Sequence, residues 1–117
     1  MRRPTRADML GARWANRALR EARAKLATGE LKGITIAPPR DVPASGVRGV
    51  RAVLRLRRHS CLEGALIRQS WAASHGDRRD VVIGVRRPSE GFGAHAWLEG
   101  ERDGEISGMR EITRLPI

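Results

Sequence analysis

Two residues of this 117-residue chain, Cys61 and His95, have the types that together perform nucleophilic catalysis. The flanking pattern predicts that Cys61 opens a helix and that His95 lies in the middle of a strand, in the string FGAHAWLEG. A thiol at a helix N-terminus is favoured as the nucleophilic thiolate, and a histidine beside it can take up the proton. Catalysis would require the fold to bring these two side chains together.

The start of the helix is marked by a capping box, because Glu63 follows Ser60 by three residues. In this motif each side chain accepts a hydrogen bond from the other residue's backbone N–H, so Ser60 is the predicted N-cap. Helical spacing continues to a stop near Gly76. Residues 57–59 are basic and favour the thiolate, whereas Glu63 adds an opposing charge one turn away. The alternative interpretation is that Cys61 is a small apolar residue of the core.

The net charge of +10 is concentrated before the cysteine. Residues 1–58 contain 15 Lys and Arg against 4 Asp and Glu, whereas residues 59–117 contain 8 against 9. Such a basic surface attracts an acidic protein or peptide, or nucleic acid. Stacking aromatics among the basic residues would support nucleic acid, but Phe92 is the only Phe, Tyr is absent and no Trp lies in a basic run. We therefore expect the basic half to bind a protein partner.

The length of the chain predicts one domain, residues 1–117, with a helix and extended arm over 1–46 and a catalytic core over 47–117. One cysteine excludes an intramolecular disulfide framework. Three His and one Cys lack metal-ligand spacing, so neither a metal nor another cofactor is expected. The chain has no apolar run of membrane-spanning length and no secretory signal at its start, which predicts a cytoplasmic protein.

Helical patterns occupy the first two-thirds of the chain, and strand patterns occupy the last third. A first helix is capped by Thr5 or Asp8 and runs to about Thr28, and Ser45 is the candidate cap of a second helix. Residues 80–85, 91–99 and 109–115 are predicted strands. This order predicts an α+β fold in which N-terminal helices pack on a small three-stranded antiparallel meander.

A third catalytic group follows from the predicted geometry of the last two strands. If residues 92–99 and 107–115 form a hairpin that turns near Asp103, position 95 lies opposite position 111. Directly opposed residues share one face of a sheet, so Glu111 would lie beside His95 and could orient the imidazole. Asp103, in the turn, is the competing candidate. The alternative is that Glu111 is a solvated charge of the strand.

Three segments together resemble the leader peptidases of lasso-peptide biosynthesis, which are transglutaminase-like, papain-related cysteine hydrolases. The segments are CLEGALIRQSW (61–71), VVIGV (81–85) and FGAHAWLEG (92–100), and the resemblance covers roughly residues 47–100. It implies a transglutaminase-like cysteine-protease core with Cys61 as nucleophile and His95 as base. The family usually places an Asp shortly after the histidine strand. No Asp follows Asp103 here, so either Glu111 substitutes or the site works as a dyad.

The resemblance implies a cysteine peptidase that removes the leader from a ribosomally made precursor peptide. It also implies a separate leader-binding protein as a partner, with the lasso cyclase as a further candidate. A second hypothesis keeps the fold but transfers the acyl group to an amine, as transglutaminases do. A third is a non-catalytic module whose basic half binds nucleic acid.

Other residues near the predicted site have structural alternatives. Trp97 shares the His95 face and would wall the site or serve as a core aromatic. Gln69 is better explained as structural than as a donor to the oxyanion. His59 precedes the cap and is expected in a loop, and His75 is expected to cap the end of the helix.

Overall fold

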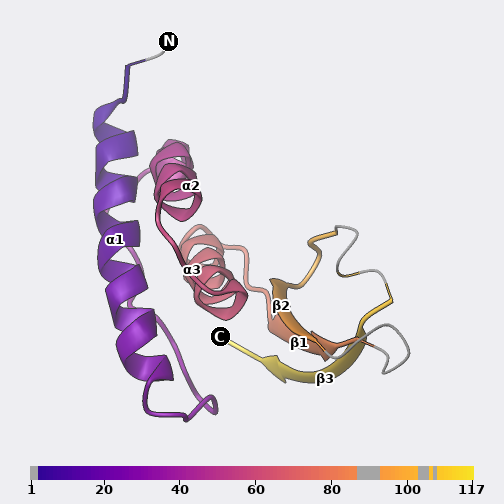
Figure 1. The fold of residues 1–117 in the computed structure, drawn as a ribbon. Coiled ribbons are helices and arrows are strands. Elements are labelled where there is room, and N and C mark those ends of the chain that lie inside the picture. The colour runs from indigo at the N-terminus through magenta and orange to yellow at the C-terminus, as the bar shows by residue number, and fades with distance from the viewer. Residues whose placement is uncertain (1–2, 87–92, 103–105, 107) are drawn as a thin grey trace.

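The computed structural model describes residues 3–86, 93–102, 106 and 108–117, and Figure 1 shows their arrangement. The helices are α1 (Arg6–Leu26), α2 (Val47–Leu56) and α3 (Cys61–Ser74), with a 3-10 turn, Ala44–Gly46, before α2. The strands are β1 (Val81–Val85), β2 (Ala94–Leu98) and β3 (Arg110–Leu115). The predicted α+β fold, with helices preceding a small antiparallel sheet, is confirmed.

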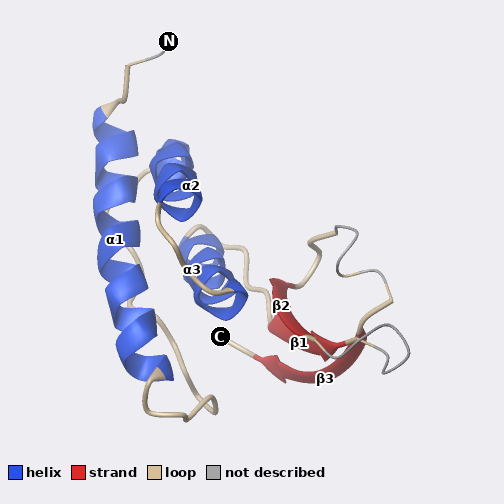
Figure 2. Ribbon diagram, in the orientation of Figure 1, coloured by secondary structure: helices blue, strands red, loops and turns tan. Residues whose placement is uncertain are grey.

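Helix α3 lies between the α1–α2 pair and the sheet, as Figures 1 and 2 show. Its side chains therefore pack in both directions, and Leu66 and Ile67 are fully buried. The core joins residues from all layers: Trp14, Leu19, Ile36, Val50, Leu66, Ile67, Trp71, Val81, Leu98 and Leu115. This central position makes α3 the element that relates the sheet to the N-terminal helices.

Helix α1 begins as predicted, with a capping box between Thr5 and Asp8. Trp14, on its buried face, donates its indole N–H to the carbonyl of Ala37, 3.0 Å away. Ser70 of α3 donates to the carbonyl of Ile36 at 3.0 Å. The extended segment after α1 is thus held against the helices by hydrogen bonds to its backbone.

Helix α2 begins without the predicted Ser45 cap. The residue at its N-cap is Gly46, which makes no side-chain capping bond. A Cβ at Gly46 would lie 2.6 Å from the carbonyl oxygen of Ala7, so glycine is required where the chain crosses α1. The Ser45 prediction was wrong because close backbone packing, and not capping, determines how this helix starts.

The sheet has the strand order β2-β1-β3, with both pairs antiparallel. The predicted meander, in which β2 would pair with β3, was wrong. Strand β1 is the most apolar and most deeply buried of the three, so it takes the central position, and the more polar strands take the edges. The predicted alternation in β2 is confirmed for residues 95–98, since Ala96 and Leu98 are buried while His95 and Trp97 are half-buried, whereas Ala94 at the start of the strand is exposed.

Candidate active site

Cys61 is the first residue of α3, and the predicted capping box is present in both directions. The backbone N–H of Glu63 donates to Ser60 Oγ at 3.1 Å, and the Ser60 N–H donates to Glu63 Oε1 at 2.6 Å. Cys61 itself is exposed. An accessible thiol therefore lies at the positive end of the helix dipole.

The carboxylate of Glu63, which opposes a thiolate, is compensated by Arg23 of α1. Arg23 Nε donates to Glu63 Oε2 at 3.1 Å, and its guanidinium also donates to the carbonyl of Arg58. Glu63 is largely buried, so this ion pair offsets much of its charge near the thiol. The same contact ties α1 to the start of α3, a link that the local sequence pattern did not reveal.

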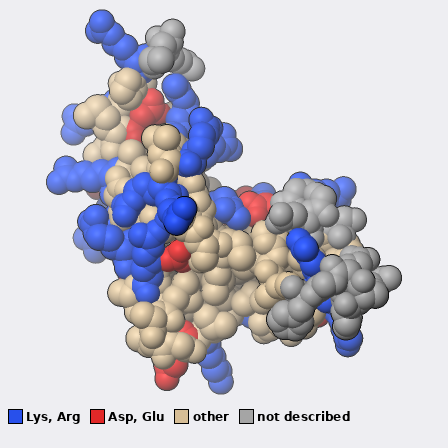
Figure 3. Space-filling view, in the orientation of Figure 1, with Lys and Arg blue, Asp and Glu red and all other residues tan. Residues whose placement is uncertain are grey.

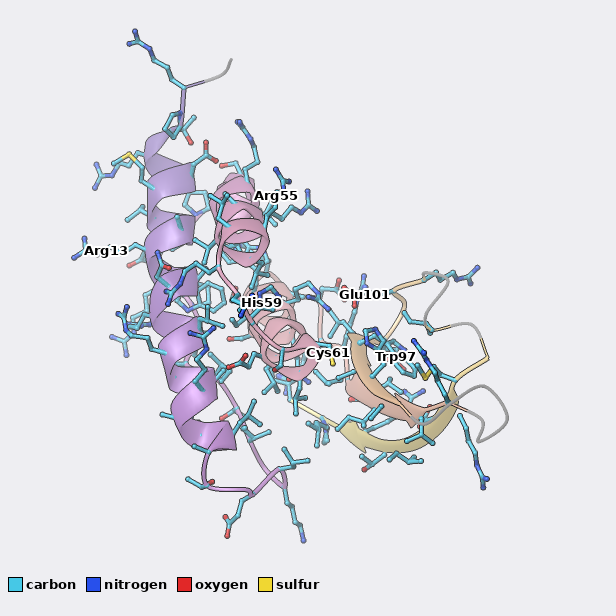
Figure 4. The ribbon with its side chains drawn as sticks, in the orientation of Figure 1. Arg13, Arg55, His59, Cys61, Trp97 and Glu101 are labelled. Carbon is cyan, nitrogen blue, oxygen red and sulfur yellow. The ribbon has the colours of Figure 1, made fainter. Side chains whose placement is uncertain are left out.

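The outer edge of β2 faces the start of α3. The Gly93 carbonyl accepts from the Arg86 N–H, and the Glu99 N–H donates to the Asp80 carbonyl. Odd-numbered residues therefore bond toward β1, and the amides of even-numbered residues in β2 point to the outer edge. At that edge the Ala96 N–H donates to Cys61 Sγ at 3.4 Å. The thiol is thereby held on the backbone of β2, one residue from His95. Figure 4 shows Cys61 and Trp97 at this junction of α3 and β2.

His95 and Trp97 stack on the same face of β2. Their ring centroids are 6.0 Å apart, and their planes are inclined by 22°. The indole extends across β1 over Gly84, where a Cβ would lie 2.7 Å from Trp97 Cη2 and 3.0 Å from the Arg110 carbonyl oxygen. The glycine of VVIGV therefore makes room for Trp97 to stack beside the imidazole of His95.

A second contact joins α3 to the edge of β2. Arg68 of α3 forms a two-pronged ion pair with Glu101, at 2.7 Å from Nε and 3.0 Å from Nη2. Glu101 Oε1 in turn accepts the Leu98 N–H at 2.8 Å. The two outward amides of Ala96 and Leu98 are therefore bound by Cys61 and by the Arg68–Glu101 pair, respectively. We refer to these two contacts together as the α3–β2 seam.

Glu111 lies on the same sheet face as His95, but not beside it. Both residues are opposite Gly84, on the two different neighbours of β1. Their backbones lie about two strand spacings, or roughly 9.5 Å, apart, with β1 between them. The predicted hairpin was therefore wrong, and Asp103, the competing residue, lies outside the described residues. A bulge in β3 at Ile112 brings Glu111 opposite Gly84.

The carboxylate of Glu111 is instead paired with Arg114, at 2.8 and 3.0 Å. The hydrogen bond from Arg114 lowers the pKa of Glu111, and desolvation partly opposes this shift. Glu111 is exposed, in agreement with the alternative interpretation of a solvated strand charge. Its carboxylate is thus directly engaged by a guanidinium.

A comparison with models of known protein families identifies the family of the chain. The family model described as the transglutaminase-like superfamily matches residues 5–113, which include Cys61, His95 and all three strands up to Thr113. The chain belongs to the transglutaminase-like superfamily. No curated protein and no solved structure matches it significantly.

Membership in the transglutaminase-like superfamily points to the chemistry of a cysteine peptidase or an acyltransferase. Over the residues that the structure describes, no group of His, Cys, Asp and Glu could hold a metal ion. Within the same residues, no helix is long and apolar enough to cross a membrane.

The remaining candidates have structural partners in this superfamily fold. Gln69 is buried and donates to the carbonyls of Arg79 and Leu115, so its predicted structural role is confirmed. The His75 ring lies 2.9 Å from the Trp71 carbonyl at the end of α3, as expected of a cap. His59 lies in the loop before the cap, as expected, and its half-buried ring packs against α3 at Gly64.

Proposed function

We propose that this protein is a cysteine peptidase that removes the leader from a lasso-type precursor peptide, with Cys61 as nucleophile and His95 as acid and base. The observation that carries the proposal is the hydrogen bond from Ala96 to Cys61 Sγ, which holds an exposed thiol at a helix N-terminus one residue from His95. The resemblance of residues 47–100 to lasso leader peptidases supports the choice of substrate.

In the proposed reaction the Cys61 thiolate attacks the scissile carbonyl carbon, and a sulfur–carbon bond forms. Protonated His95 gives its proton to the amine as the carbon–nitrogen bond breaks. Water then attacks the thioester while His95 takes up the water's proton, and the sulfur–carbon bond breaks to release the acid.

The oxyanion would be stabilised by amides at the start of α3. The first main-chain bond of the helix runs from Gly64 N–H to the Ser60 carbonyl, and the Glu63 N–H is used by the cap. The amides of Cys61 and Leu62 precede these bonds in the first turn and point toward the helix start. They are the donors that we assign to the oxyanion.

The genes beside this one provide the first test. A short precursor, an asparagine-synthetase-like cyclase and a small leader-binding protein would support the lasso pathway, and their absence would contradict the choice of substrate but not the peptidase mechanism. The encoded precursor is then incubated with the chain in H₂¹⁸O and analysed by mass spectrometry. We expect one ¹⁸O in the new carboxylate and no cleavage by Cys61→Ala.

Acyl transfer is the second candidate, because superfamily membership covers transferases as well as peptidases. The same incubation with a primary amine distinguishes them. Incorporation of the amine in preference to ¹⁸O would replace hydrolysis with transfer while keeping the roles of Cys61 and His95.

We further propose that a leader-binding protein docks on the basic surface of α1 and delivers the precursor. Figure 3 shows Lys and Arg gathered over the α1–α2 part of the molecule. A hollow of about 440 Å³ beside α1 is lined by four arginines: Arg13, Arg17, Arg20 and Arg40. The charge of this surface suits an acidic partner, and the aromatic residue that lines the hollow, Trp14, is buried and so does not offer an exposed face for stacking bases.

The docking proposal predicts slow cleavage by the isolated chain and faster cleavage with the partner, an acceleration that weakens as salt is added. Full activity without the partner would contradict delivery. Strong inhibition by unrelated DNA would favour the nucleic-acid alternative.

A further inference from the structure

The face of α3 that carries Cys61 leads to a second cavity. This cavity, of about 220 Å³, lies between α2, α3 and the end of β2, and we call it the α2–α3 cavity. Arg68 and Ala72 line it, seven and eleven residues after Cys61, and so lie within roughly 20° of the cysteine around the helix. Leu98, which also lines it, is two residues, or about 7 Å, along β2 from Ala96.

The walls of the cavity are apolar, and its rim is positively charged. Its apolar lining residues are Val47, Val50, Leu54, Trp71, Ala72 and Leu98. The rim holds three arginines, Arg51, Arg68 and Arg79, and one acid, Asp77.

Two of these guanidinium groups already have anionic partners. Arg68 is bound by Glu101, and Arg79 pairs with Asp77 at 2.9 Å. Arg51 is exposed and forms no ion pair with any residue that the structure describes. The cavity therefore combines an apolar interior with one uncompensated positive charge at its entrance, and this combination suits an apolar group next to a carboxylate.

We propose that the α2–α3 cavity is a specificity subsite that takes one apolar side chain of the substrate peptide, while a neighbouring carboxylate of that peptide pairs with Arg51. This inference rests on the proposed peptidase function. The volume lies below the roughly 300–1,000 Å³ of small-molecule sites, so a single side chain fits better than a whole cofactor. An extended peptide advances about 3.3 Å per residue, which places the bound residue two or three positions from the attacked bond.

The test uses electrophilic peptides that alkylate Cys61, because covalent capture reports weak binding as a rate. One series carries a C-terminal fluoromethyl ketone and the other an N-terminal chloroacetyl group, so that both peptide directions are sampled. Each series places Leu-Glu, Leu-Lys, Ala-Glu or Ala-Lys one to four residues from the reactive group. In one series we expect Leu-Glu, at the second or third position, to react roughly five- to tenfold faster than Leu-Lys or Ala-Glu.

Arg51→Glu should remove or reverse the preference for Glu over Lys and leave the preference for Leu over Ala. Lys32→Glu, an exposed position in the turn after α1, changes the net charge by the same amount and should retain both preferences. Equal rates for all four pairs in both series, or an equal effect of the two variants, would overturn the subsite. Iodoacetamide, which carries no peptide, separately reports thiol reactivity, so an inert Cys61 would refute the peptidase proposal and not the subsite alone.

Discussion

The joint between α1 and α2 and the α3–β2 seam are both close contacts, but different atoms make them. At the joint between α1 and α2, the backbones of the two helices are in contact: a Cβ at Gly49 would overlap the Asp8 carbonyl and lie 2.8 Å from the Ala12 nitrogen. At the seam, side chains reach across to backbone amides, Cys61 to Ala96 and Glu101 to Leu98.

This difference determines what each contact can do. Backbone packing fixes the positions of two helices but presents no reactive group. At the seam, Cys61 can react without releasing β2 from α3, because the Arg68–Glu101 pair also holds the strand to the helix. Substitutions at the α1–α2 joint should therefore lower the stability of the fold, whereas substitutions around the α3–β2 seam should lower the rate of catalysis.

The largest effect is expected from His95→Ala, which should lower kcat/KM for precursor cleavage by roughly 10²–10⁴-fold, the usual contribution of a general acid–base. His95 is half-buried at the sheet surface, so the thermal midpoint should fall by no more than about 4 °C. His59→Ala is the matched control and should retain activity within a few-fold. The reverse ranking of the two histidines would identify His59 as the base.

Gly49→Ala should destabilise the fold by about 3 kcal/mol or more, because the new methyl group meets backbone on two sides. The gain in helix propensity of about 1 kcal/mol does not offset this cost. Gly64→Ala, in α3, is the matched control, since the atoms nearest to its Cβ would be the movable ends of the His59 and Arg68 side chains. Urea unfolding of both variants measures the difference, and equal losses would contradict the contrast between the two joints.

Arg68→Gln and Glu101→Gln should each lower kcat/KM several-fold while changing stability by about 1 kcal/mol or less, because the pair is partly exposed. The double variant should be no worse than either single one, as expected of residues that act as a pair. Hydrogen exchange at the Leu98 amide should accelerate in Glu101→Gln. Arg79→Gln, which breaks the nearby exposed pair with Asp77, is the control and should leave exchange at Leu98 unchanged.

The start of α3 and the faces of β2 could be predicted because local patterns specify them. A capping box involves residues three apart, and alternation fixes which side of a strand each residue occupies. These two rules place Cys61 at a helix start and separate His95 from the buried Ala96 and Leu98, and the structure agrees on all of these positions.

The strand order and the two ion pairs of the site could not be predicted, because they depend on distant segments. Arg23 meets Glu63 across 40 positions, and Arg68 meets Glu101 across 33. The periodicity of a single helix or strand gives no information on contacts between residues so far apart in the sequence. The apolar character of VVIGV did contain a signal, since a strand buried on both faces favours the centre of a sheet. Had this rule been applied to the order of the strands, it would have placed β1 at the centre, between the strand of His95 and the strand of Glu111.

The smallest effect is expected from Glu111→Gln, which tests whether a carboxylate two strands away supports the imidazole. Since β1 separates Glu111 from His95 and Arg114 engages the carboxylate of Glu111, the rate of cleavage should stay within about twofold at neutral pH.

The lowered pKa of Glu111 means that its ionised form favours the folded state. This stabilisation is present above the ordinary glutamate pKa of about 4.3 and is lost as the pH falls through the lower value in the fold. Acid unfolding of Glu111→Gln should therefore approach that of the unaltered chain at low pH and differ slightly at neutral pH. A loss of activity comparable to that of His95→Ala, without unfolding, would instead restore Glu111 as the third catalytic residue.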